Sequence, residues 1–403
     1  MEKGDGDFGS DLLAVRVGAG VSAGLAAPAG DPDSRQAKRL ETTRQLNVLI
    51  DDEWDWRLRE QPTFAAYLGD RRHNSRWPDV SLKAINRRHG HRRAVLKQLA
   101  AIDRNMLAPG DRLNYDLFRR QYAVSVESHA HRWFLVPLTA RDGIQDASST
   151  ADVIRFEQVE DYRQWLARLR SFREYMDQTI ALMQVGLKER RVHDREVMVR
   201  VPAQIARQIV DDPRKSLFYK PFRSFPESVS LSDREKLRGE AVQAISDVVV
   251  PAYRHFLKFF NDSYLPGCFP RAGVWQMPRG KEFYAFRCRR FTTTDLTPSQ
   301  IHDIGKREVK RIRGEMEKVI RQTKFDGSFR EFLDFMRTDP RFFLQERRGP
   351  VGSLSRGDQA NRSAPGPIVP STAPDPLWCR GNPDASGAGY NNGLFTVPRR
   401  LTA

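Results

Sequence analysis

Hydroxyl, basic and aromatic side chains gather near residue 290, directly before a predicted helix, where they could contact an anion or a substrate. Thr297 and Pro298 are typical of a helix start, because threonine caps free amides and proline suits the first turn. The positive end of the helix dipole favours an anion there, although the same turn could serve only as a cap. The candidate contact residues are Tyr284, Arg290, Thr292, Thr293, Thr294 and His302.

The other residue types that commonly do chemistry form no recognisable set. The pairs His89/His91 and His129/His131 are two residues apart, so on a helix their side chains point in different directions. No H-E-x-x-H pattern and no Walker lysine of a phosphate-binding loop occurs, and the three cysteines lack C-x-x-C spacing. The sequence therefore predicts no catalytic residue, no metal ligand and no cofactor in this chain.

The net charge of +16 and the pI near 10.0 raise the question of a nucleic-acid partner. Most of the 67 basic residues are arginines, and they are scattered among acidic residues. No basic stripe with interleaved aromatic residues, of the kind that holds a single strand, is present. We therefore expect no nucleic-acid binding. A basic nucleic-acid binder is kept only as a third hypothesis for function, after the two given at the end of this section.

Residues 1–34 are predicted to be either a flexible extension or a degenerate secretory signal. The segment 12–29 is small and mildly apolar and ends in Ala-Pro-Ala, but acidic residues precede it and Arg16 interrupts it. A signal would place the protein in the periplasm or outside the cell, and its absence would place it in the cytoplasm. No run of 18 apolar residues occurs, so no membrane span is predicted.

Residues 35–343 are predicted to form one large, mostly α domain of long amphipathic helices with few short strands. Apolar residues recur at helical spacing and Ser, Thr and Pro mark the helix starts. The segment 162–183 is either one long helix or two helices broken near Ser171. The expected helices are 35–59, 81–102, a helix opened by Pro109, 162–183, a short helix at 201, 232–262, 298–321 and a last one after Ser328; the expected strands are 132–138 and 272–277.

The composition changes after residue 343. From residue 345 to the end, 16 of 59 residues are Gly or Pro, and no apolar period of 3.6 or 2 persists. Such a segment buries too little apolar surface to offset the entropy of ordering it. Residues 344–403 are therefore predicted to be disordered, either as a natural tail or as the product of a shifted reading frame.

Six stretches resemble the family called domain of unknown function 885. Together they extend over residues 45–343. The stretches are 52–70 (DEWDWRLREQPTFAAYLGD), 113–119 (LNYDLFR), 161–166 (DYRQWL), 201–225 (VPAQIARQIVDDPRKSLFYKPFRSF), 283–312 (FYAFRCRRFTTTDLTPSQIHDIGKREVKRI) and 334–343 (DFMRTDPRFF).

The resemblance implies a helical scaffold like that of the gluzincin metallopeptidases. It also implies zinc and a peptide substrate in intact relatives, which are expected to cleave peptide or amide bonds. The family's zinc motif, H-E-x-x-P-G-H-H, lies downstream of the segment that matches 292–302, and this chain lacks it. Codons for 386–394 (SGAGYNNGL) exist that, shifted by one base, encode the family-like stretch A-A-P-D-T-T-T-A-Y.

These observations lead to two main hypotheses. The first is a truncated, inactive member of a zinc-metallopeptidase-like hydrolase family. The second is a helical protein that binds a peptide or another partner without catalysis. The sequence gives no substrate and no oligomeric state.

Overall fold

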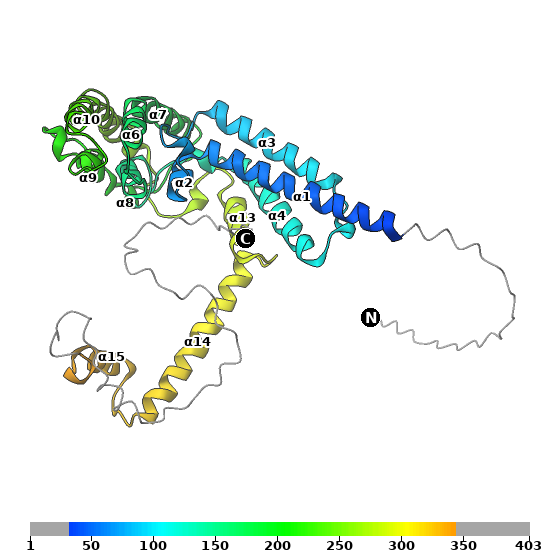
Figure 1. The fold of residues 1–403 in the computed structure, drawn as a ribbon. Helices are drawn as coiled ribbons and strands as arrows, with labels where there is room; N and C mark the ends of the chain where they lie inside the picture. The colour runs from blue at the N-terminus through cyan, green and yellow to red at the C-terminus, as the bar shows by residue number, and fades with distance from the viewer. Residues whose placement is uncertain (1–31, 344–403) are drawn as a thin grey trace, which may run out of the picture. The chain divides into compact units, whose positions relative to one another are not determined.

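The computed structural model describes residues 32–343, which form helices and short helical turns (Figure 1). The chain divides into two compact units, residues 1–56 with 91–123 and residues 57–90 with 124–403. No residue of the described range belongs to a β-strand, so the prediction of a mostly α protein is confirmed. The predicted N-terminal extension and C-terminal tail lie outside these residues, except that α1 begins at Pro32.

The first unit is built from parts of three long helices that also contribute residues to the second unit. These are α1 (Pro32–Glu60), α3 (Leu82–Ala101) and α4 (Pro109–His129). A small core joins them, and the Tyr115 hydroxyl donates a 3.0 Å hydrogen bond to the Leu99 carbonyl within it. The buried apolar residues of this core are Leu46, Val95, Leu99, Ile102, Leu107 and Tyr115.

The second unit contains the remaining helices and the larger core. Its short helices are α2 (Pro62–Tyr67), α5 (Thr150–Val153), α8 (Arg195–Met198), α9 (Val201–Ala206) and α12 (Leu265–Gly267). Its longer helices are α6 (Val159–Arg170), α7 (Phe172–Lys188), α10 (Leu231–Ala244), α11 (Val250–Phe259), α13 (Gly280–Thr292), α14 (Pro298–Gln322) and α15 (Phe329–Thr338).

Three of the longer helices begin at capping residues. Ser230, Thr297 and Ser328 each accept a hydrogen bond from a backbone amide of the first turn, which satisfies a donor that has no partner within the helix. The predicted break at Ser171 is confirmed, because α6 ends at Arg170 and α7 begins at Phe172. The predicted helix 232–262 is helical throughout, and it consists of α10 and α11 joined by a π-helical turn.

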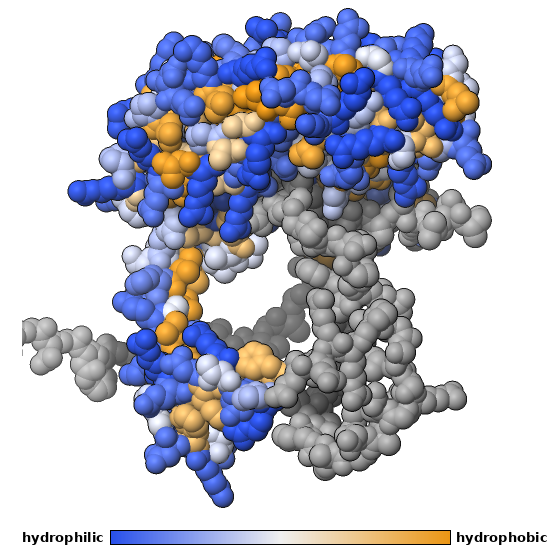
Figure 2. Space-filling model, turned by 90° about the vertical axis from the view of Figure 1, so that its left-hand side faces the viewer, coloured by the Kyte–Doolittle hydropathy of each residue, from blue (hydrophilic) through white to orange (hydrophobic). Residues whose placement is uncertain are grey.

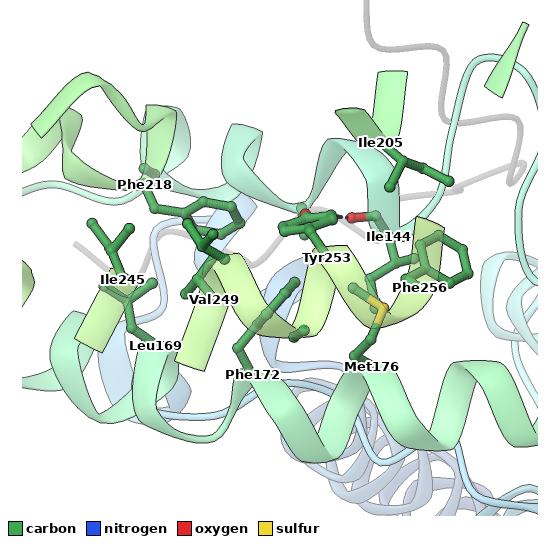
Figure 3. Close-up of a cluster of buried hydrophobic side chains, with 14 of the residues drawn as sticks. Ile144, Leu169, Phe172, Met176, Ile205, Phe218, Ile245, Val249, Tyr253 and Phe256 are labelled. Carbon is green, nitrogen blue, oxygen red and sulfur yellow. Dashed lines mark hydrogen bonds between the residues drawn. The ribbon is translucent and has the colours of Figure 1, made fainter. Parts of the chain in front are cut away.

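The largest fully buried side chains in the core of the second unit are mostly aromatic, and Figure 3 shows several of them among aliphatic residues. The rings of Phe172 and Tyr253 lie 5.3 Å apart, and both side chains are fully buried. The Tyr253 hydroxyl donates a 2.7 Å hydrogen bond to the Ile144 carbonyl, so its polar atom has a partner inside the core. This core positions α7, on which part of the cavity described below is built.

The two predicted strands are wrong. Residues 133–135 and 274–276 each form one turn of 3₁₀ helix. Both segments begin at a residue with positive φ, 51° at Arg132 and 123° at Gly273, which is incompatible with an extended strand. Apolar runs alone do not distinguish strands from buried turns.

The proline-rich segment 211–228 packs against the core through its aromatic residues. It forms two short 3₁₀ helices, Pro213–Lys215 and Leu217–Phe222. Phe218, Tyr219 and Phe222 are buried, and the Phe218 carbonyl accepts a 3.1 Å hydrogen bond from Nε1 of Trp165. These contacts pack the segment against the core of the second unit.

Candidate functional site

The threonine-rich turn between α13 and α14 is held by its own hydroxyl groups. Thr292 Oγ1 donates to the Cys288 carbonyl at 2.9 Å and lies 2.8 Å from Thr294 Oγ1. Thr293 ends α13 in the left-handed conformation, with φ 56°. The hydroxyls of Thr292 and Thr294 are therefore used in local hydrogen bonds.

The start of α14 is closed by a reciprocal cap. Thr297 Oγ1 accepts from the Gln300 amide at 3.3 Å, and Gln300 Oε1 accepts from the Thr297 amide at 2.8 Å. This capping box satisfies two donors that would otherwise be available to an anion. The described contacts thus account for the turn as a cap, and its contact with an anion or a substrate stays a prediction.

The other three candidate contact residues lie on the helices that flank the turn. Tyr284 is exposed on α13, and His302 is exposed on α14. Arg290 is half-buried, with its Cζ 5.6 Å from the Phe291 ring centroid. Within the described residues, the only interaction that joins two of the six candidates directly is the contact between Thr292 and Thr294.

Histidines from different sequence pairs come together in the second unit. The His89 and His129 rings lie 3.9 Å apart, and the His129 Nε2 lies 3.2 Å from Asn86 Oδ1. Spacing along the chain does not predict this contact. No group of three or more His, Cys, Asp or Glu residues between 32 and 343 is placed to hold a metal ion.

Helix α14 exposes an apolar stripe, which is the second feature that could bind a partner. Its residues recur at helical spacing on one side of the helix, and Figure 2 shows apolar side chains exposed along the part of the chain that leads to α15. Met316 and Val319, for example, are 43% and 57% exposed. The exposed apolar residues of the α14 stripe are Ile304, Val309, Ile312, Met316 and Val319.

A cavity of about 380 Å³ lies in the second unit, and we call it the Trp77 cavity. Four segments form its walls, three of them within residues 59–87 and the fourth at residues 171–178, so no single motif predicted it. They are the end of α1 with the start of α2, the stretch between α2 and α3, α3 itself, and the start of α7. The lining residues used below are Arg59, Glu60, Arg76, Trp77, Asp79, Arg87, Glu174 and Tyr175.

None of the helices in the described range is both long and apolar enough to span a membrane.

No curated protein matches the sequence. A solved structure of a candidate lipoprotein from Colwellia psychrerythraea has a similar fold, with a TM-score of 0.60 and 15% sequence identity. The match covers 76% of this chain and 55% of that one, so this chain spans little more than half of the solved relative.

The family comparison covers most of the chain. Residues 62–356 match the model of a family described as bacterial protein of unknown function, DUF885. Six stretches of the sequence carried the resemblance to this family. The matched range contains five of them in full, and it contains residues 62–70 of the stretch 52–70. The chain therefore belongs to the DUF885 family of bacterial proteins.

Proposed function

We propose that this chain is the truncated, non-catalytic N-terminal part of a zinc-metallopeptidase-like hydrolase with a gluzincin-like helical scaffold. Its intact relatives would bind zinc and cleave peptide or amide bonds. In such a relative, the exposed Tyr284 and His302 would be accessible for contact with a peptide substrate.

The exposed stripe of α14 carries this proposal. An amphipathic helix of 25 residues normally buries its apolar side against another element. Each large apolar side chain that stays exposed forgoes roughly 1.5–3 kcal/mol of burial. The stripe is therefore the place where a further part of a hydrolase would pack. The length of the solved relative, of which this chain matches 55%, is consistent with such a part.

The nucleotide sequence of the gene tests the proposal. We expect that a shift of one base near the codon for Leu344 restores a frame that encodes H-E-x-x-P-G-H-H. A gene in which no frame downstream of this codon encodes the motif would contradict the truncation.

The second candidate function is the binding of a peptide or another partner without catalysis. The closed core of the second unit favours it, because residues such as Trp165, Phe172 and Tyr253 are fully buried by the described chain alone. A sharp thermal transition of a monomer that does not bind an apolar dye would support this candidate over the first.

A further inference from the structure

The Trp77 cavity has a rigid aromatic wall. The Trp77 and Tyr175 rings stack with centroids 5.3 Å apart and planes 6° apart. Trp77 Nε1 donates a 2.7 Å hydrogen bond to the Arg168 carbonyl, and the Arg168 Cζ lies 5.1 Å from the Trp77 ring centroid. Because Arg168 is fully buried, it holds the indole from the side of the core. The wall therefore offers fixed apolar surface to a ligand.

Two guanidinium groups at the cavity have no carboxylate partner in the described chain. Arg76 Nη2 contacts only the ring nitrogen Nδ1 of His73, at 3.1 Å, and the Arg59 carbonyl, at 3.5 Å. The Arg59 side chain lines the same cavity, and no salt bridge joins it to a described residue. Arg87, in contrast, pairs with Glu60 at 2.7 Å, so both of those charges are already used.

Two carboxylates at the cavity likewise form no salt bridge with a described residue, although Asp79 interacts electrostatically with Arg87 and Arg88. Glu174 accepts from the Gln178 side-chain amide at 3.2 Å. Asp79 accepts from the Ser81 backbone amide at 2.9 Å. Neither carboxylate reaches Arg59 or Arg76, although all four residues line one cavity. Opposite charges are thus kept apart around a space large enough for a small molecule.

We propose that the Trp77 cavity binds a zwitterionic small molecule, namely a free α-amino acid or a dipeptide with an aromatic or aliphatic side chain. Arg59 and Arg76 bind its carboxylate, Glu174 and Asp79 bind its ammonium group, and its side chain packs on Trp77 and Tyr175. Charge-assisted hydrogen bonds of this kind are stronger than neutral ones.

The size of the cavity limits the ligand. Small-molecule sites in proteins span roughly 300–1,000 Å³, and about 380 Å³ lies at the low end of this range. A single amino acid or a dipeptide fits such a volume, whereas a longer peptide has to extend out of it. The proposal does not rest on the proposed zinc chemistry, since none of the lining residues is among the six candidate contact residues.

Isothermal titration calorimetry of the full chain tests the proposal with four probes. The probes are phenylalanine, the dipeptide phenylalanylphenylalanine, N-acetylphenylalanine, which lacks the ammonium group, and phenylalaninamide, which lacks the carboxylate. We expect at least one of the two zwitterions to bind about tenfold more tightly than either blocked compound, which corresponds to about 1.4 kcal/mol.

Variants that remove charges test separately the residues that bind the ligand's carboxylate and those that bind its ammonium group. In the double variant Arg59→Gln/Arg76→Gln, phenylalanine should bind no better than phenylalaninamide. In the double variant Asp79→Asn/Glu174→Gln, it should bind no better than N-acetylphenylalanine. The controls Arg200→Gln and Glu196→Gln remove exposed charges outside the cavity and should leave all affinities unchanged. Circular dichroism verifies that each variant is folded.

Three results would overturn the proposal. The first is no binding of either zwitterion at millimolar concentration by the folded chain. The second is equal affinity for a zwitterion and a blocked compound, which would show a simple ion site. The third is an equal loss of affinity in the cavity variants and in the two controls.

Discussion

The Glu53 carboxylate is buried in the first unit, and its Oε1 lies 2.6 Å from Nε2 of His91. The other carboxylate oxygen, Oε2, accepts a hydrogen bond from the Tyr122 hydroxyl. The His91 ring also stacks on Trp56, with centroids 3.9 Å apart. One acidic side chain thus joins α1, α3 and α4, and both of its oxygens have partners.

Replacement of Glu53 by alanine should destabilise the first unit by about 1–3 kcal/mol, because it leaves two half-buried polar groups without their acceptor. Hydrogen exchange of the amides in α1, α3 and α4 measures the effect. Glu41→Ala is the matched control on α1, since Glu41 pairs with Arg44 at the surface. Equal exchange in the two variants would show that the buried pair contributes nothing.

The two cysteines of the described chain should differ in reactivity. Burial raises the pKa of the Cys268 thiol to about 12, so roughly one molecule in ten thousand carries the reactive thiolate at pH 8. Cys288 is half-buried on α13. In a Cys379→Ser background, mass spectrometry after iodoacetamide treatment should show Cys288 labelled at least about tenfold faster. Faster labelling of Cys268 would contradict its burial.

Acid should weaken the second unit through His193. The imidazole donates from Nε2 to the Leu138 carbonyl at 2.8 Å, and burial lowers its pKa below the ordinary 6.5. As the pH falls through 6.5, the unfolded chain takes up the proton first, so this contribution to stability is present above pH 6.5 and is lost below it.

His193→Gln keeps a hydrogen-bond donor and removes the titration. Denaturant unfolding at pH 7 and pH 5 should therefore show a smaller acid loss in His193→Gln than in the unchanged chain. His302→Gln, at an exposed position on α14, serves as the control and should behave like the unchanged chain. An unaltered acid loss in His193→Gln would assign the effect to other groups.

The α14 stripe should bind an apolar dye. The double variant Ile312→Gln/Met316→Gln should lower the fluorescence of bound anilinonaphthalene sulfonate by roughly half, because it interrupts the exposed apolar surface. Lys310→Gln/Lys318→Gln changes two charged positions of the same helix and should have little effect. A dye signal that is the same in both double variants would place the dye elsewhere.

Helices with strong local signals could be predicted from the sequence. Thr297-Pro298 and Ser328 start α14 and α15 as expected, because capping depends on residues close together in the chain. Helix α13 was missed, since its apolar residues Phe283 and Phe286 give only a short pattern. The two strands were wrong because positive φ at Arg132 and Gly273 is not visible in an apolar run.

Prediction of the candidate sites from the sequence is limited in the same way, because it detects only residues that are close together in the chain. The threonine turn could be found because its residues are adjacent, but only the structure shows that Thr292 and Thr294 bond to each other. The Trp77 cavity could not be found, because Arg59, Trp77 and Tyr175 meet through tertiary packing. No local spacing encodes a contact between residues about one hundred positions apart.

The zinc content of the purified chain tests the central claim most directly. Elemental analysis compares the unchanged chain with a second chain whose reading frame is restored at the codon for Leu344. The account predicts no stoichiometric zinc in the unchanged chain and one zinc per molecule in the restored chain, because the ligands of the H-E-x-x-P-G-H-H motif are present only in the latter. One tightly held zinc in the unchanged chain, or none in the restored chain, would contradict it.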